Sequence, residues 1–471
     1  MARVSLTTTL PYVNADPHMG HALEFVQADI VARHRRMLGD DVFFNTGTDE
    51  HGQKIYEKAQ AAGEEVQAYV DRYAARFGLL KERLDLSYNA FIRTTDDKHV
   101  RAAQEFWRRC DARGDICKKA YRVKYCVGCE LEKTDSELVD GRCPLHPLNE
   151  VSLIEEENYF FRFSRYQEPL LELYRTRPDF VVPPSRLHEI RSFVERGLED
   201  FSISRLKAKM PWGIAVPGDS DHVMYVWFDA LVNYVSTLDW PLETYKEWWP
   251  SVQFAGKDNL RQQSAMWQAM LMSAGIEPSK QIMIHGFITS GGQKMSKSIG
   301  NVIDPSAIVD RYGTDALRYY ITRHITPFED SDMTMGRFHE CYTANLVNGL
   351  GNLIARIMKL AETHLDGPVA VVDDALPDTY HAALGAYEFN AAADMVWERI
   401  GALDTRMTHD APFKVVKTDA EAGKRIIADM VREVYVIGRL LACIMPATSE
   451  AIIAAVRANT KPNNLFPRIE E

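Results

Sequence analysis

The sequence predicts an α/β protein that is built on a parallel sheet, carries a metal-binding insert and ends in a helix bundle. Three observations lead to this fold class. Residues 4–10 are rich in β-branched side chains and residues 22–38 have helical apolar spacing, which is typical of a buried strand followed by a crossover helix. A CxxC and CxxH pair interrupts the α/β pattern between residues 126 and 146. From residue 312 onward, helical spacing largely replaces strand patterns.

The length and composition are those of a globular protein with more than one domain. The 471 residues allow two or three domains, and 46% hydrophobic with 26% charged residues excludes collagen-like, disordered and membrane classes. No apolar run reaches the length of a membrane span and the chain starts almost directly in a strand, so we expect a cytoplasmic protein without a membrane partner. A net charge of −11 argues against indiscriminate coating of nucleic acid, although a local basic face can still hold one folded RNA.

The first candidate site is the joint between the first strand and the first helix, where the sequence reads PYVNADPHMGH. Asn14 and Asp16 supply turn and cap chemistry, so we expect His18 and His21 in the first helical turn and on one face. A helix N-terminus with two imidazoles favours a phosphate group, and Gly20 lets a nucleotide lie close to the backbone. Either histidine taken alone is more readily explained as a satisfied core or surface residue.

A second phosphate-binding candidate is the loop GGQKMSKS at residues 291–298. Its glycines loosen the loop, and Lys294 and Lys297, three positions apart, can close over a triphosphate. A lysine and serine loop that stands alone is usually a solvated turn. The combination of HxGH and KMSKS, however, resembles the signature of class I aminoacyl-tRNA synthetases, and no Walker motif of a P-loop protein is present.

Acidic residues follow two further predicted strands. Asp49, in TGTDEHG after the strand at 41–45, stands where open parallel sheets bind ligands and is well placed to hold a cationic amine. Capping of the next helix is an equally good explanation of Asp49. In FAGKD, Gly256 and Asp258 end another strand, at a position that suits an adenosine ribose.

The segment YVWFDALVNY at residues 225–234 is a candidate wall of an apolar pocket. Trp227, Ala230 and Tyr234 recur at helical spacing along it. A plain core helix explains this spacing equally well, so the residues alone do not decide between the two.

Four potential metal ligands are clustered in a segment of short strands and turns. Cys126, Cys129, Cys143 and His146 form CxxC and CxxH half-sites with the spacing of a tetrahedral zinc knuckle. Disulfides are the rival explanation, but they do not suit the cytoplasmic chain that we expect. Because four protein ligands leave no open position, we expect one structural Zn²⁺ per chain.

The last third of the chain predicts helices at residues 345–362, 388–407 and 423–443. Asn352 and Arg356 are four positions apart and share a face of the first of these helices, as a base-reading pair requires. A solvated polar surface is the more common explanation of such a pair.

Over nearly its whole length the chain resembles the methionyl-tRNA synthetases. The segments that carry the resemblance occur in the family's order: LPYVNADPHMGH, TGTDEHG, the cysteine and histidine knuckle, GLEDFSISR, YVWFDA, GKD, HGFITSGGQKMSKS and LFPRIE. The resemblance implies a Rossmann-like catalytic domain in two halves (1–115 and 226–300), a connective insert with the knuckle (116–225), a stem-contact region (301–344) and an anticodon-binding helix bundle (345–471).

The resemblance also implies the reaction. Methionine and ATP form methionyl-adenylate and pyrophosphate, and methionine then passes to the terminal adenosine of tRNA(Met) for initiation and elongation. The resemblance implies that Mg²⁺ bound with ATP and four side chains neutralise the charge on the phosphates. These side chains are His18, His21, Lys294 and Lys297. ATP binding further involves Gly20, Gly256 and Asp258. The methionine site carries over to Leu10, Tyr12, Asp49, Trp227, Ala230 and Tyr234, and an apolar aromatic pocket suits a thioether.

Two positions depart from the family's pattern. Gln263 stands where many members have a histidine that lines the methionine pocket, and it keeps a hydrogen-bond donor there. Phe413 replaces the tryptophan that stacks on an anticodon base, with less stacking area. The sequence ends at LFPRIEE, without the further tRNA-binding domain through which some relatives dimerise, so a monomer is expected.

Three alternatives to a methionine enzyme fit the sequence less well. A synthetase-like ligase with a small-molecule acceptor usually lacks an anticodon bundle, which this chain keeps. An inactive RNA-binding paralogue tolerates damage to the histidine pair or the lysine loop, and both are intact. A sister synthetase for leucine, isoleucine or valine typically carries a large editing insertion, and the insert here is short.

Overall fold

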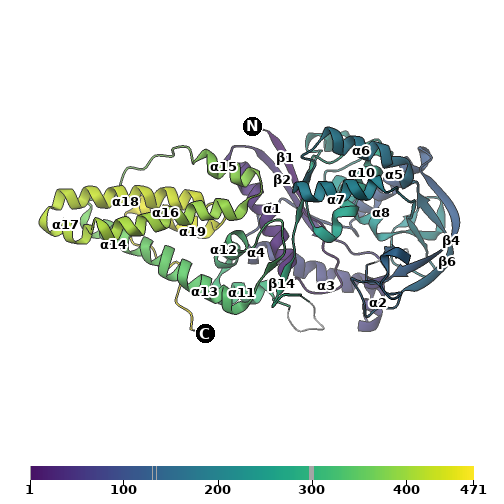
Figure 1. The fold of residues 1–471 in the computed structure, drawn as a ribbon, viewed down its shortest axis with the longest axis horizontal. Coiled ribbons are helices and arrows are strands. Elements are labelled where there is room, and N and C mark those ends of the chain that lie inside the picture. Colours follow the sequence, from purple (N-terminus) through teal and green to yellow (C-terminus); the bar gives the residue numbers. More distant parts are fainter. Residues whose placement is uncertain (1, 130, 134, 296–301, 471) are drawn as a thin grey trace.

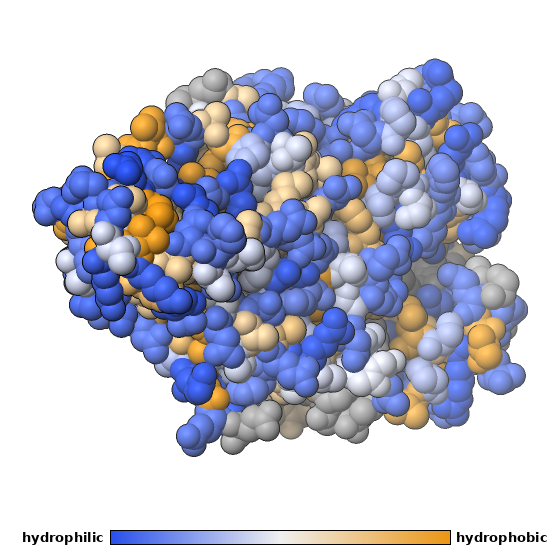
Figure 2. Space-filling model, turned by 60° about the vertical axis from the view of Figure 1, so that its left-hand side comes forward, coloured by the Kyte–Doolittle hydropathy of each residue, from blue (hydrophilic) through white to orange (hydrophobic). Residues whose placement is uncertain are grey.

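The structure, a computed structural model, describes residues 2–129, 131–133, 135–295 and 302–470 and has two unlike halves. Figure 1 shows strands with shorter helices on one side and the long C-terminal helices on the other, with α1 (Met19–Met37) between them. Figure 2 shows the molecule with the bundle turned forward, and hydrophilic residues predominate on that face. In the described part of the chain, none of the helices combines the length and the apolar character needed to cross a bilayer.

A six-stranded parallel sheet forms the centre of the first half. Its strand order is β3-β2-β1-β12-β13-β7, and every neighbouring pair is parallel. Because the order runs outward in both directions from β1 and β12, the crevice at their carboxyl ends is the place where such sheets bind ligands. The strands are β1 Arg3–Thr7, β2 Asp41–Thr48, β3 Ala90–Arg93, β7 Val181–Val182, β12 Val252–Gly256 and β13 Gln281–His285.

Burial explains why these segments are strands and why α1 follows the first of them. Four of the five residues of β1 are buried, as expected of a strand that is covered on both faces. The apolar face of α1 packs on the same sheet, with Leu23, Val26 and Ile30 buried. The other helices of this half are α2 Gln53–Ala62, α3 Val66–Gly78, α4 Leu80–Arg83, α5 Asp97–Ala112, α6 Gln167–Thr176, α7 Pro184–Glu195, α8 Val226–Ala230, α9 Asn233–Ser236 and α10 Trp267–Ser273.

Apart from β7, the strands in the segment between β3 and β12 form two antiparallel sheets. One sheet has the order β5-β4-β6-β8 and a second has the order β10-β11-β9. Figure 1 shows the long strands β4 and β6 at the edge of the molecule that lies farthest from the bundle. The strands are β4 Ile116–Cys126, β5 Leu131–Lys133, β6 Ser152–Phe161, β8 Phe201–Ser202, β9 Ser204–Leu206, β10 Ala215–Val216 and β11 Asp219–Met224.

The C-terminal third is helical after one small sheet, as the sequence predicts. The small sheet joins β14 (Ile288–Ser290), β15 (Gln293–Lys294) and β16 (Ser331–Asp332). Local capping fixes several helix starts, since Asp304 accepts from the N–H of Ser306 and Asp419 accepts from the N–H of Ala422. The helices are α11 Pro305–Tyr312, α12 Thr314–His324, α13 Met335–Cys341, the π-helical η6 Tyr342–Gly351, α14 Asn352–His364, α15 Asp378–Gly385, α16 Phe389–His409, α17 Pro412–Thr418, α18 Ala420–Leu441 and α19 Pro446–Ala458.

A buried ion pair joins the bundle to the parallel-sheet half. Arg318 on α12 lies 2.8 Å from Asp29 on α1, and both side chains are fully buried. The guanidinium also donates to the carbonyl oxygens of Leu84, Cys443 and Ile444, which belong to the two halves. Because one buried hydrophobic cluster also runs from Val4 to Phe466, the two halves share a core.

Candidate active site

A cavity of about 500 Å³ opens at the carboxyl ends of β1 and β12. Its walls come from the segments after β1, β12 and β13, from the first turn of α1, and from α8 and α9. Twelve of the residues that the sequence assigns to ATP or methionine line this cavity: Leu10, Tyr12, His18, Gly20, His21, Asp49, Trp227, Ala230, Tyr234, Gly256, Asp258 and Gln263.

His18 and His21 form a reciprocal cap at the start of α1. The backbone N–H of Gly20 donates to His18 Nδ1 at 3.1 Å, and the backbone N–H of His18 donates to His21 Nδ1 at 3.2 Å. The two rings are stacked, with centroids 3.8 Å apart. The expectation that Asn14 and Asp16 cap this helix is wrong, because His18 is itself the N-cap.

The cap changes what this turn offers to a phosphate. The N–H of Gly20 is used by the His18 ring, and the N–H groups of His21 and Ala22 bond the carbonyl oxygen of His18. Burial, together with neighbouring His18, holds the pKa of His21 well below its usual value. His21 is therefore neutral at pH 7, and since its Nδ1 accepts, its proton lies on Nε2. The first turn thus offers imidazole donors more than backbone amides.

Asp49 reaches the cavity through an extension of the parallel sheet. Beyond the ends of β1 and β2, Tyr12 and Asp49 form a parallel bridge, in which the N–H of Asp49 donates to Pro11 O (2.9 Å) and that of Val13 donates to Asp49 O (3.1 Å). The N-cap of α2 is Gly52, so the alternative that Asp49 caps this helix is wrong. A buried carboxylate at this edge suits a cationic amine.

The apolar wall consists of two short helices and one π-helical turn. Trp227 and Ala230 lie on α8, Tyr234 lies on α9, and Gln263 lies on the π-helical η5 (Gln262–Met266). Gln263 Nε2 donates to the hydroxyl of Tyr234 at 2.7 Å, and burial raises the pKa of Tyr234. Trp227 Nε1 and Gln263 Oε1 are buried and make no hydrogen bond to the described residues. A bound ligand can therefore satisfy them.

The opposite wall is the end of β12. A side chain on Gly256 would place its Cβ 2.9 Å from Asp258 Oδ1, so glycine keeps the backbone open beside this carboxylate. Asp258 itself is exposed on a 3-10 turn (Lys257–Asn259, η4). An exposed carboxylate beside a bare backbone suits the hydroxyls of a ribose.

The lysine loop leaves β14 through a glycine hairpin. Gly291 and Gly292 have φ angles of 63° and 73°, which is the left-handed region that a tight two-residue turn requires. The N–H of Gly292 donates to Asp332 on β16, and the backbone of Lys294 pairs with Thr289. Lys297 lies outside the described residues.

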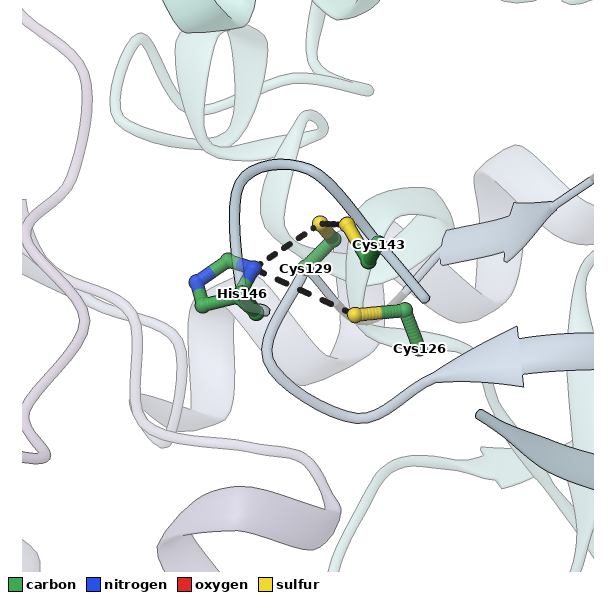
Figure 3. A group of neighbouring side chains, drawn as sticks. All are labelled: Cys126, Cys129, Cys143 and His146. Carbon is green, nitrogen blue, oxygen red and sulfur yellow. Dashed lines mark hydrogen bonds between the residues drawn. The ribbon is translucent and has the colours of Figure 1, made fainter. Parts of the chain in front are cut away.

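Cys126, Cys129, Cys143 and His146 come together as the sequence predicts. All four ligand atoms lie within 4.8 Å of one another, and Figure 3 shows the His146 ring facing the three sulfurs. His146 Nδ1 lies 3.2 Å from the sulfur of Cys129 and 3.9 Å from that of Cys126. Bonds of about 2.0 Å to nitrogen and about 2.3 Å to sulfur bring tetrahedral ligands to similar separations, so the group fits a zinc ion.

The knuckle also borders the cavity. Gly128, Cys129, Leu145 and His146 are among the lining residues. A Cβ on Gly128 would lie 2.4 Å from the His146 ring, so the close turn between the first two cysteines requires glycine. Loss of the metal is therefore expected to change the shape of the cavity wall, although the four ligands leave no open position on the metal itself.

The three residues assigned to the anticodon lie outside the cavity. Asn352 and Arg356 are exposed on α14, and Arg356 faces Asp404 at 3.5 Å. Phe413, on α17, is 38% exposed. Figure 1 shows α17 at the end of the bundle that lies farthest from the parallel sheet.

Sequence reasoning missed a buried polar network behind the apolar wall. Asp229 on α8 accepts from His51 Nδ1 (2.7 Å) and from His99 Nε2 (2.8 Å), and its side chain is fully buried. Although burial opposes the charge, the two histidines lower the pKa of Asp229. A carboxylate inside the apolar run YVWFDA was the available signal, but its partners lie far away in the sequence.

The parallel sheet with its switch point, the HxGH turn at the first helix and the glycine hairpin before the lysines define a class I tRNA synthetase. The family model described as tRNA synthetases class I (M) matches residues 4–152 and 147–358. The chain belongs to this family, the methionine–tRNA ligases.

Named relatives and solved structures agree over the full chain. The methionine–tRNA ligase of Thermosynechococcus vestitus is 42% identical over 95% of this chain and 89% of its own length. That of Thermotoga maritima is 37% identical over 97% of this chain and 76% of its own. The Mycobacterium tuberculosis methionyl-tRNA synthetase in complex with methionyl-adenylate superimposes with a TM-score of 0.91 at 35% identity, covering 100% of this chain and 99% of that one.

Proposed function

We propose that this chain is an active methionine–tRNA ligase that activates L-methionine with ATP and charges tRNA(Met) for translation initiation and elongation. The observation that carries the proposal is the cavity, in which the candidate ATP residues and the candidate methionine residues meet. The first-listed relatives are named for this activity, and a solved relative holds methionyl-adenylate. The order of motifs, which resembles that of the family, and the intact histidine pair favour this function over a ligase for a small acceptor and over an inactive paralogue.

The chemistry divides between the two walls of the cavity. The methionine carboxylate attacks the α-phosphate in line and pyrophosphate leaves, so the enzyme must position two substrates and neutralise charge. Asp49 holds the methionine ammonium group, while Leu10, Tyr12, Trp227, Ala230, Tyr234 and Gln263 surround its side chain.

Gly256 and Asp258 hold the ribose, and the phosphates lie near Gly20. His18 and His21 donate to the phosphates, and Lys294 and Lys297 close over them. Mg²⁺ bound with ATP would supply further positive charge at the phosphates. In the second step a ribose hydroxyl of the tRNA's terminal adenosine attacks the methionyl carbonyl and AMP leaves.

Zinc is the metal that we assign to Cys126, Cys129, Cys143 and His146. Three thiolates and an imidazole form a closed tetrahedral set, so this Zn²⁺ stabilises the fold of the knuckle and takes no part in the reaction. Replacing Cys126 by serine should lower the bound zinc from about one per chain and reduce stability. Unchanged zinc in that purified variant would refute the assignment.

For tRNA we assign the anticodon to the bundle at 345–471, with Asn352 and Arg356 reading bases and Phe413 stacking on one of them. The acceptor stem passes the region 301–344, and the catalytic halves 1–115 and 226–300 enclose the insert 116–225. The cytoplasmic location and the monomeric state remain predictions.

ATP–pyrophosphate exchange without tRNA tests the proposal. The purified chain is offered methionine, leucine, isoleucine, valine and cysteine separately, and we expect exchange with methionine only. A preference for another amino acid would contradict the assigned pocket. No exchange with any of them, from folded protein, would favour the inactive paralogue.

A further inference from the structure

A second buried ion pair lies in the wall of the cavity, and the proposed reaction assigns it no role. Glu24 on α1 and His285, the last residue of β13, both line the cavity. His285 Nε2 lies 2.9 Å from Glu24 Oε2, and the two side chains are 5% and 8% exposed. The pair thus connects the helix that carries the histidine cap to the strand that leads into the lysine loop.

Hydrogen bonds and the acidity of the two groups together fix the charge of both partners. Glu24 Oε1 accepts from the backbone N–H of Thr9 (2.7 Å) and from its hydroxyl (2.6 Å), and Oε2 lies 2.9 Å from His285 Nε2. Because a carboxyl group is a stronger acid than an imidazolium, the proton between Oε2 and Nε2 lies on His285, opposite a carboxylate. His285 Nδ1 lies 2.7 Å from the carbonyl oxygen of Gly286, which can only accept. Both ring nitrogens of His285 therefore donate, and an imidazole with two N–H groups is positively charged.

His99 offers a comparison, because its hydrogen-bond partners do not require a second ring N–H. Its Nε2 faces Asp229, but its Nδ1 lies 2.9 Å from the hydroxyl of Ser236, which can donate a proton. A neutral His99 therefore satisfies both of its partners. At His285 the second partner is a carbonyl, so the neutral ring would leave one acceptor unsatisfied in a buried site, which is costly.

The groups around His285 act in the same direction. Burial lowers the pKa of His285, but the hydrogen bond and the charge of Glu24, the carbonyl of Gly286 and the charge of Asp258 on η4 outweigh burial and raise it. Tyr234 also lines the cavity, and burial together with the charge of Glu24 raises its pKa, so it stays neutral. A Cβ built on Gly256 would lie 3.5 Å from His285 Cε1, which places this edge of the ring beside the proposed ribose site.

We propose that His285 is a positioning residue for adenylate formation, held as an imidazolium by Glu24. The ion pair ties the carboxyl end of β13 to α1 and to Thr9, and it places positive charge behind the wall formed by Gly256. The ligand class that benefits is the anionic adenylate, whose charge lies between the ribose and the amino acid. This inference rests on the proposed function for its ligand, whereas the charge of His285 does not depend on it.

The charge is tested directly in the full chain by NMR. Protein labelled with ¹⁵N-histidine gives ring nitrogen signals that distinguish an imidazolium from each neutral tautomer, and the His285→Asn spectrum identifies the signals of His285. We expect His285 to be an imidazolium at pH 7. A neutral His285 at pH 7 would overturn the proposal.

The role in positioning is tested with Glu24→Gln, which keeps the shape of the side chain and removes its charge. Loss of that charge lowers the pKa of His285, and a histidine loses its charge as the pH rises through its pKa. As the pH rises, pyrophosphate exchange should therefore decline at a lower pH in the variant than in the parent. At pH 8 the variant's rate should be lower than the parent's by on the order of tenfold. Asp315→Asn is the matched control, because Asp315 is another buried carboxylate, on α12, that accepts from the N–H of Thr448.

Two outcomes separate the inference from the proposed function. If the parent exchanges with methionine and Glu24→Gln keeps the parent's pH profile, the positioning role is wrong while the function stands. If the parent does not exchange, the function fails, and the NMR spectra still decide the charge of His285. If Glu24→Gln does not fold, the parent's spectra, with His285→Asn for assignment, remain a complete test of the charge.

Discussion

The cavity wall and the far end of the bundle are built on opposite principles. In and behind the cavity wall, several charged groups are buried and held by partners from other segments, as for Asp229 with His51 and His99. In the bundle, the residues assigned to the anticodon on α14 and α17 are exposed, and Arg356 faces Asp404 at 3.5 Å. Buried pairs preorganise a small, fixed ligand, whereas exposed side chains can adapt to a large, flexible one. The comparison predicts that the two regions affect different steps of the reaction.

The junction between the regions should show the largest effect on stability. Arg318→Met removes a positive charge from beside Asp29 and leaves three carbonyl oxygens without their donor. Because all of these partners are buried, water cannot replace the guanidinium. We expect a loss of about 3–5 kcal/mol in the free energy of unfolding, measured by urea denaturation. Arg399→Met, which breaks the half-buried pair with Glu433 inside the bundle, should cost about 1 kcal/mol or less. Equal losses would contradict the central role of the junction.

Lys297→Ala should have the largest effect on the chemical step. The lysine charge acts on the phosphates in the transition state, so pyrophosphate exchange should fall by about 100- to 1,000-fold while tRNA binding, measured by filter retention, stays near that of the parent. Lys246→Ala removes an exposed lysine that pairs with Glu243 and should leave exchange unchanged. Parent-level exchange in Lys297→Ala would remove the lysine loop from the mechanism.

The sequence predicted the site better than the links around it, for a physical reason. HxGH and GKD are short segments at the ends of strands of the parallel sheet, and parallel topology brings such ends together whatever fills the rest of the chain. The knuckle lies outside this sheet and was predicted from the spacing of its ligands alone. The cap of α1 was wrong because His18 and His21 bond backbone groups within their own turn, which composition does not indicate. Two buried ion pairs form only on folding, namely Asp29 with Arg318 and Glu24 with His285. No motif in the sequence indicates which residue each of them contacts.

A histidine pair at the junction should make stability depend on pH. His34 on α1 is buried and lies 3.0 Å from His381 on α15, with Arg35 and Asp40 also nearby. Burial and the neighbouring His381 lower the pKa of His34 to about 4. As the pH falls, His34 is therefore protonated at a higher pH in the unfolded chain than in the folded one. The free energy of unfolding keeps this contribution above about pH 6.5 and loses up to about 3 kcal/mol as the pH falls toward 4.

His34→Gln isolates this contribution. The variant should lose less stability than the parent between pH 6.5 and about 4.5 in urea titrations, because its side chain does not titrate. Identical pH dependence in the two proteins would show that His34 does not govern it.

The smallest effect is expected at the end of the bundle, where the comparison is sharpest. Phe413→Ala removes a stacking surface, worth about 1–2 kcal/mol per base, so the KM for tRNA should rise by roughly tenfold. Exchange without tRNA should not change, because α17 lies at the far end of the bundle from the parallel sheet whose strand ends border the cavity. Phe413→Trp enlarges the surface and should restore or improve charging, and Leu242→Ala, which truncates an exposed side chain in the catalytic half, serves as the control. A fall in exchange with Phe413→Ala would mean that the exposed end and the buried cavity are coupled, and the division between the two regions would not hold.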